Sequence, residues 1–86
     1  MHTVELLKRA LTAAKLAGYH IRQEWLDGCA GGGCQINGQK WLFLDLALNI
    51  QEQLDQVIEA LRDDPQVDIS GLPLELSKRL SSDKAA

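Results

Sequence analysis

This chain of 86 residues has few cysteines, prolines and aromatic residues, and it has no excess of positive charge. It has two cysteines and two histidines, whereas a structural zinc site normally takes four ligands of these types. Nine lysines and arginines against twelve acidic residues leave a net charge of −3, while nucleic-acid-binding proteins carry clustered basic residues. The longest apolar run, Trp41–Leu48, is interrupted by Asp45 and is far shorter than a membrane-spanning helix. We therefore expect neither a nucleic-acid partner nor a membrane partner.

The chain length and the amino-terminal segment predict one small cytoplasmic domain. Residues 1–20 are interspersed with charged side chains and lack the apolar stretch that a secretory signal requires. The hydrophobic content of 45% is enough for one core. We expect a single domain over residues 1–80, followed by a frayed tail over residues 81–86.

Three segments have the apolar periodicity of helices. The first covers residues 3–17, and Gly18 follows it as a candidate left-handed terminator. In the second, Asn49 and Glu52 have the spacing of a capping box, and apolar residues then recur at helical spacing. A short third helix is predicted to begin at Pro73. The solvent-facing side of the second helix is predicted to carry Gln51, Gln53 and Gln56.

Two further segments alternate as strands do. Residues 19–25 change to a period of two, and the pair Asn37-Gly38 favours a two-residue hairpin between residues 34–36 and 39–46. This hairpin pairs Ile36 with Gln39 and Cys34 with Trp41. The predicted fold is therefore α+β in the order α-β-β-β-α-α. We expect a small three-stranded antiparallel sheet, two main helices packed on one of its faces and a short C-terminal helix.

The strand predicted over residues 40–46 is apolar on both faces, which is unusual in a small sheet. The helices are expected to cover one face, which comprises Leu42, Leu44 and Leu46. The other face is predicted to comprise Cys34, Ile36, Trp41 and Phe43. Either the C-terminal helix or a second copy of the chain is then needed to cover this second face, so these four residues are the predicted interface.

The segment from Gly28 to Cys34 is rich in glycine and holds both cysteines, Cys29 and Cys34. Its spacing is compatible with a metal-binding pair, although two further ligands are missing. A redox pair is a second alternative, although no lysine or arginine lies nearby to lower a thiol pKa. The favoured interpretation is structural, with Cys34 as a small apolar residue. We therefore assign no metal, no cofactor and no catalytic residue.

A small anionic ligand is a further alternative, because successive glycine N–H groups can form an anion-binding nest. The candidate loop residues are Gly28, Gly31, Gly32 and Gly33. They do not match a phosphate-binding loop, since no lysine follows the last glycine. Asp45, an acid within the apolar run, is interpreted as a cap for the segment that follows, and His20 is expected on the polar side of its strand.

Two resemblances concern the middle of the chain. The run from Gly38 to Leu46 fits the pattern GxxxLFLDL, and together with the Leu16–Tyr19 and Glu52–Leu54 motifs it resembles a group of short bacterial proteins of unknown function. That resemblance implies a small cytoplasmic bacterial protein. The strand followed by the second helix is also similar to the region before the zinc helix of ImmA/IrrE-type peptidases. Residues 57–63 lack the HExxH motif, so this similarity implies a non-catalytic module.

The sequence therefore predicts a protein that works by association, with itself as a homodimer or with another protein. The alternatives that stay open are a thiol or metal function of Cys29 and Cys34, and anion binding at the glycine loop.

Overall fold

The computed structural model describes residues 2–26, 31–62 and 64–81. It confirms the α+β class and the element order α-β-β-β-α-α. The elements are α1 (Thr3–Leu16), β1 (Tyr19–Glu24), β2 (Gly32–Ile36), β3 (Gln39–Asp45), α2 (Ile50–Leu61) and α3 (Leu74–Ser81). Helix α3 therefore runs one residue into the predicted tail, and residues 82–86 lie outside the described residues. Gly18, with a φ of 99°, lies after α1 at the predicted turn.

The sheet has the order β1-β3-β2, with β3 in the centre. Strands β2 and β3 are antiparallel, whereas β1 and β3 are parallel, so the sheet is mixed rather than wholly antiparallel. Strands β1 and β2 therefore lie on opposite sides of β3, and the hairpin returns the chain through the middle of the sheet. The physical reason is that β1 carries the charged residues Arg22 and Glu24, which suit an edge strand, so β3 takes the central position.

The hairpin forms in the predicted register. Asn37 and Gly38 have φ angles of 53° and 79°, as both central positions of a type I′ turn require. Ile36 then pairs with Gln39, and Cys34 pairs with Trp41.

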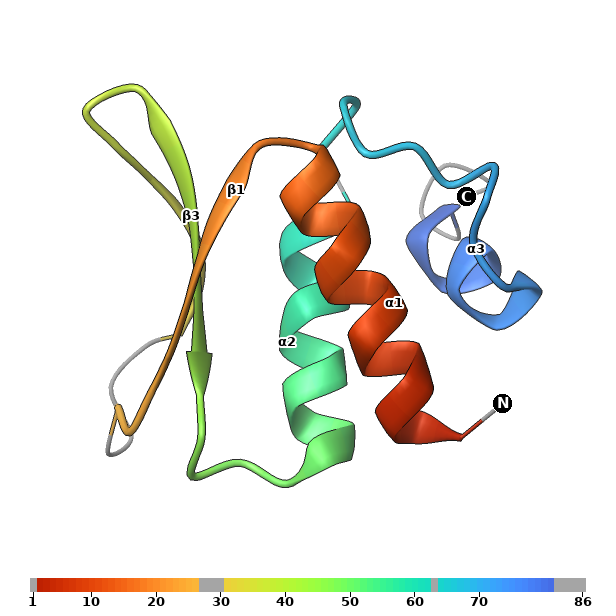
Figure 1. Ribbon diagram of the computed structural model, residues 1–86, viewed down its shortest axis with the longest axis horizontal. Coiled ribbons are helices and arrows are strands. Elements are labelled where there is room, and N and C mark those ends of the chain that lie inside the picture. Colours follow the sequence, from red (N-terminus) through yellow and green to blue (C-terminus); the bar gives the residue numbers. More distant parts are fainter. Residues whose placement is uncertain (1, 27–30, 63, 82–86) are drawn as a thin grey trace.

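All three helices lie on one side of the sheet (Figure 1). Helices α1 and α2 pack against the sheet and against each other, and α3 packs on α2 at the side remote from the sheet. Leu42 and Leu44 of β3 are fully buried against them. The other members of the core are Leu6, Leu7, Ala10, Ala13, Ala14, Leu54, Val57, Ile58, Leu61, Leu76 and Leu80. We call the sheet side that faces these helices the inner face, and the opposite side the outer face.

Helix α2 begins with the predicted capping box. The Asn49 side chain accepts a hydrogen bond from the N–H of Glu52 at 2.8 Å, and the Glu52 carboxylate accepts one from the N–H of Asn49 at 3.1 Å. Its glutamines differ from expectation, because Gln53 is buried and its Nε2 donates to the carbonyl of Leu48 at 2.9 Å. In the described part of the chain, no helix combines the length and the apolar character that crossing a membrane requires.

Candidate functional site

The outer face of the sheet carries the four residues predicted as an interface. Trp41 and Phe43 of β3 alternate with the buried Leu42 and Leu44, and the β2–β3 register places Cys34 beside Trp41. Trp41 and Phe43 are half-buried, and Ile36 is 44% exposed. Among the described elements, each helix lies on the inner side, so the alternative that the C-terminal helix covers this face is wrong.

The aromatic side chains on this face form a continuous stack. The rings of Trp41 and Phe43 lie nearly parallel, with centroids 6.0 Å apart and an interplanar angle of 14°. The His20 ring of β1 extends the stack, at 4.8 Å from the Trp41 ring. His20 joins the face because the parallel pairing places it opposite Trp41. The alternation of β1 is visible in the sequence but its parallel register is not, so His20 is predicted on the polar side without a link to the aromatic residues.

Charged residues of both signs flank the stack along β1. Arg22 lies opposite Phe43 in the register, and its guanidinium forms an ion pair with the Glu24 carboxylate. Both side chains are about half exposed, at 56% for Arg22 and 44% for Glu24. The outer face therefore has an apolar centre and a rim on which one positive and one negative charge offset each other.

Asp45 ends β3 and is 4% exposed. Its Oδ1 accepts hydrogen bonds from the N–H of Ala47 at 2.9 Å and from the N–H of Leu26 at 3.2 Å. These contacts agree with the prediction that Asp45 caps the following segment, and they also anchor the chain leaving β1. The carboxylate is thus used in holding two backbone segments at the end of the sheet.

The cysteine and glycine segment is described only from Gly31 onward. Gly28 and Cys29 lie outside the described residues, so a pairing of Cys29 with Cys34 stays a prediction, as does anion binding by the loop. Cys34 is a free, exposed thiol on β2. Groups of three or more histidine, cysteine or acidic side chains suited to a metal ion do not occur among the residues that the structure describes.

Two of the described glycines let β2 approach α2 closely. A Cβ atom on Gly33 would lie 3.2 Å from the Cβ of Ala60, and one on Gly31 would lie 2.7 Å from the Nε2 of Gln56. Larger side chains at these inner-face positions would push β2 away from α2. The glycines therefore have a packing role, whatever else the loop does. Gln56, predicted on the solvent side, is half-buried here and accepts from the N–H of Asp45 at 3.4 Å.

A polar pocket with a volume of about 590 Å³ opens between β2 and α2. Its walls are Gly31 and the β2 residues from Gly32 to Gln35, the α2 residues Gln56 and Glu59, and Tyr19 and Lys40 on the neighbouring strands. The sequence signal for this pocket was the glycine run itself, because Gly31, Gly32 and Gly33 can contribute only backbone groups to its wall.

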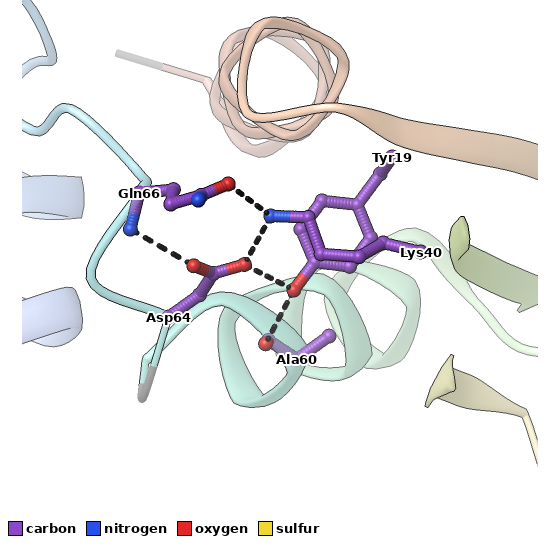
Figure 2. Close-up of polar contacts among 5 residues, drawn as sticks. All are labelled: Tyr19, Lys40, Ala60, Asp64 and Gln66. Atoms are coloured by element: carbon purple, nitrogen blue, oxygen red, sulfur yellow. Dashed lines mark hydrogen bonds and ion pairs between the residues drawn. The ribbon is translucent and has the colours of Figure 1, made fainter. Parts of the chain in front are cut away.

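Tyr19, Lys40 and Asp64 form a hydrogen-bonded cluster at one end of the pocket (Figure 2). Oδ2 of Asp64 accepts from the Tyr19 hydroxyl at 2.7 Å and from the Lys40 ammonium at 2.8 Å. The ammonium also donates to Oε1 of Gln66 at 3.1 Å and lies 4.7 Å from the centre of the Tyr19 ring. Oδ1 of Asp64 accepts from the N–H of Gln66 at 2.9 Å.

Burial and the neighbouring charges shift the pKa values of this cluster. Burial raises the pKa of Tyr19 to about 12, and the hydrogen bond to Asp64 and its negative charge add to this effect. Burial acts to raise the pKa of Asp64 too, but hydrogen bonds from Lys40, Gln66 and Tyr19 outweigh it and leave the pKa below its usual value. At neutral pH the Tyr19 hydroxyl is therefore protonated and Asp64 is charged.

The chemistry of this cluster is that of a structural connection. The charges of Lys40 and Asp64 compensate each other, and both side chains are largely shielded, at 21% and 11% exposure. The contacts join β1, β3 and the segment after α2, which are distant in sequence. This cluster has no signature in the sequence, because nothing in the spacing of Tyr19, Lys40 and Asp64 predicts that they meet.

Comparison of the chain with protein-family profiles, with curated protein sequences and with solved structures finds no match.

Proposed function

We propose that this protein is a non-enzymatic module that works by self-association, with the outer face of its sheet packed against the same face of a second copy. The observation that carries this proposal is the stack of Trp41 and Phe43 on the side of the sheet opposite the helices. Both rings are partly exposed, and apolar surface with a polar rim is typical of protein interaction sites.

The charges on this face favour a second copy as the occupant. The chain carries a net charge of −3, which opposes association of copies through most of its surface. On the outer face, however, Arg22 and Glu24 cancel each other. A two-fold symmetric contact brings each residue of a face near the same face of the partner, so Arg22 of one copy can lie near Glu24 of the other.

The architecture also favours sheet-on-sheet packing. Two sheets that pack face to face are separated by about 10 Å, which side chains of the size of Trp41 and Phe43 fill. A chain of this length buries only about 60% of the surface that it exposes when unfolded. Burying two large aromatic side chains in a partner is therefore a substantial gain, and such residues are often the ones that dominate binding energy.

The test is sedimentation of the wild-type chain and of a Trp41→Thr/Phe43→Thr variant over a wide range of concentration. Threonine keeps the preference for strand conformation while removing the aromatic surface. We expect the wild-type protein to sediment at twice the chain mass of 9.5 kDa or more, and the variant to lose the assembly step that depends on this face.

The matched control is Leu16→Gln, which removes an apolar side chain that is 85% exposed on α1. This variant is expected to associate like the wild type, because α1 lies on the other side of the sheet from the outer face. Wild-type protein that is monomeric at every concentration, or a double threonine variant that assembles unchanged, contradicts the proposal.

A further inference from the structure

The open edge of β2 lacks the features that usually protect the edges of sheets from further pairing. In the part of the chain that the structure describes, β2 pairs with β3 and with nothing else, so its second edge is unpaired. Proteins usually protect such edges with charged residues, prolines or bulges. The sequence of β2 is GGCQI, which has neither charge nor proline, and its register with β3 runs from Gly32 to Ile36 without a bulge.

The other edge of the same sheet is protected. Strand β1 carries Arg22 and Glu24, and side chains of this kind disfavour pairing with another strand. The sheet therefore has one edge that resists a further strand and one that is suited to receive it.

The hairpin geometry determines which backbone groups of β2 are available. In a two-residue hairpin, the residues that flank the turn, here Ile36 and Gln39, form a hydrogen-bonded pair, and hydrogen-bonded pairs then alternate along the strands. Cys34 and Gly32 thus bond to β3, whereas the N–H and C=O groups of Gly33 and Gln35 point toward the open edge.

We propose that β2 pairs with β2 of a second copy in antiparallel orientation, with the two-fold axis at Cys34, so that the two sheets join into one. This inference goes beyond the proposed function, because it uses a different surface and succeeds or fails independently. An axis at Cys34 is the register of greatest overlap, since Cys34 is the middle residue of the five in β2. Gly33 of each copy then exchanges hydrogen bonds with Gln35 of the other, and the joint sheet has three strands from each copy.

The inner side of the edge fits this arrangement. A strand added to β2 passes the mouth of the pocket beside α2, where Gln56 and Glu59 provide polar groups. In the proposed register, the side chain that lies opposite Gly33 on this face is Gln35 of the second copy. Its neutral amide can donate to the Glu59 carboxylate, which lines the pocket beside Gly33.

The outer side of the edge brings the two Cys34 thiols together. Because Gly33 and Gln35 make the hydrogen bonds, the two Cys34 residues form a non-hydrogen-bonded pair, whose Cα atoms are about 4.5 Å apart in antiparallel sheets. That separation lies within the range of about 4.4 to 6.8 Å seen in disulfides. Cys34 is exposed, so it reports directly on the proposed register.

The first experiment is disulfide crosslinking of a Cys29→Ser variant, which leaves Cys34 as its one thiol. The oxidant is copper phenanthroline, which accepts the two electrons released as two thiols lose their protons and form the disulfide. It is applied at a protein concentration at which sedimentation shows the assembled form. We expect rapid formation of a covalent dimer. The reciprocal Cys34→Ser variant, which keeps only Cys29, is expected to form a covalent dimer more slowly.

The second experiment separates edge pairing from chance collision. Gln35→Pro removes an N–H that points away from β3, so the hairpin is retained while the edge loses a donor; Gln35→Thr keeps that donor and is the matched control. Combined with Cys29→Ser at about 10 µM protein, Gln35→Pro is expected to slow crosslinking on the order of 100-fold, because pairing gives an effective thiol concentration in the millimolar range. Gln35→Thr is expected to crosslink like its parent.

The outcomes distinguish the two interfaces. If both operate, wild-type protein sediments as a tetramer, and either Gln35→Pro or the Trp41→Thr/Phe43→Thr pair reduces it to a dimer. If Gln35→Pro does not change the assembly while Trp41→Thr/Phe43→Thr does, the edge inference is overturned and the outer-face proposal stands. If only Gln35→Pro changes the assembly, the outer-face proposal is overturned and the edge inference stands. Slow crosslinking of the Cys29→Ser variant in its assembled form also overturns the edge inference, and so do equal crosslinking rates for Gln35→Pro and Gln35→Thr.

Discussion

The two faces of β3 differ in what their apolar residues do. On the inner face, Leu42 and Leu44 have no exposed surface and belong to the core shared with α1 and α2. On the outer face, Trp41 and Phe43 are larger but only half-buried. Burial and not hydrophobicity decides what a residue contributes to the stability of one chain. The inner residues therefore stabilise the single chain more than the outer residues do, and the outer residues keep the exposed surface on which the proposed association depends.

The largest expected effect tests this division directly. Leu44→Ala creates a cavity in the core and is expected to lower the free energy of unfolding by about 3 kcal/mol. Phe43→Ala, its neighbour on the outer face, is expected to cost less, at about 2 kcal/mol in the monomer, since part of its surface is already in water. Both are measured by urea unfolding at low protein concentration, where association contributes least. Equal losses contradict the division between the faces.

The second effect concerns the inner side of β2. Gly33→Ala places a methyl group 3.2 Å from the Cβ of Ala60 and is expected to cost about 1 kcal/mol through overpacking. Adding Ala60→Gly removes the clash, so the double variant is expected to lose less than the sum of the two single losses. Gly71→Ala, where the added methyl group meets no atom within 4 Å, is the control and is expected to be nearly neutral. Additive losses in the double variant argue against close packing of β2 on α2.

The third effect is the pH dependence of the Tyr19 cluster on the inner face. The pKa of Tyr19 is raised from 10.0 to about 12 in the folded chain, so between these values the folded state binds more protons than the unfolded state. Stability is therefore expected to fall as pH rises from 10.0 to about 12. Ultraviolet absorbance follows ionisation cleanly, because the chain has one tyrosine. Tyr19→Phe is the control and is expected to weaken this alkaline decline; a normal tyrosine titration contradicts the cluster.

The smallest effect is expected on the helix surface, away from the sheet. Arg79 and Asp55 form an ion pair at 2.8 Å between α3 and α2, with side chains 45% and 50% exposed. Asp55→Asn is expected to cost less than about 0.5 kcal/mol, since solvent and salt screen such pairs. Asp64→Asn, which disrupts the more shielded pair with Lys40, provides the comparison in the same thermal unfolding measurement and is expected to cost more.

The parts of the fold that the sequence predicted are the local ones. The Asn37-Gly38 turn and the Asn49–Glu52 capping box each depend on a few neighbouring residues, and both form as expected. The parallel pairing of β1 with β3 was not predicted, because it depends on how the chain passes the end of β3. A signal was nevertheless present, since the charged Arg22 and Glu24 of β1 favour an edge position.

In the candidate site, too, the sequence predicted the local features and not the long-range contacts. Alternation and hairpin register were enough to place Trp41, Phe43, Cys34 and Ile36 together on one face. The contribution of His20 and the meeting of Tyr19, Lys40 and Asp64 both require the long-range register of β1. Residues brought together across 24 or more positions of sequence, as in the contacts of Asp64 with Lys40 and Tyr19, leave no local pattern to detect.

The mixed sheet has a kinetic consequence. The β2–β3 hairpin closes a turn of two residues and can form within about 1 to 10 µs, whereas β1 must find β3 across a much longer loop, which costs more entropy to close. We expect the hairpin with α2 to form first and β1 with α1 to join later. Native-state hydrogen exchange is then expected to show the amides of β1 opening at lower free energy than those of β3. Strand β3 would thus form early and provide the edge on which β1 later pairs, in addition to contributing residues to both faces of the sheet.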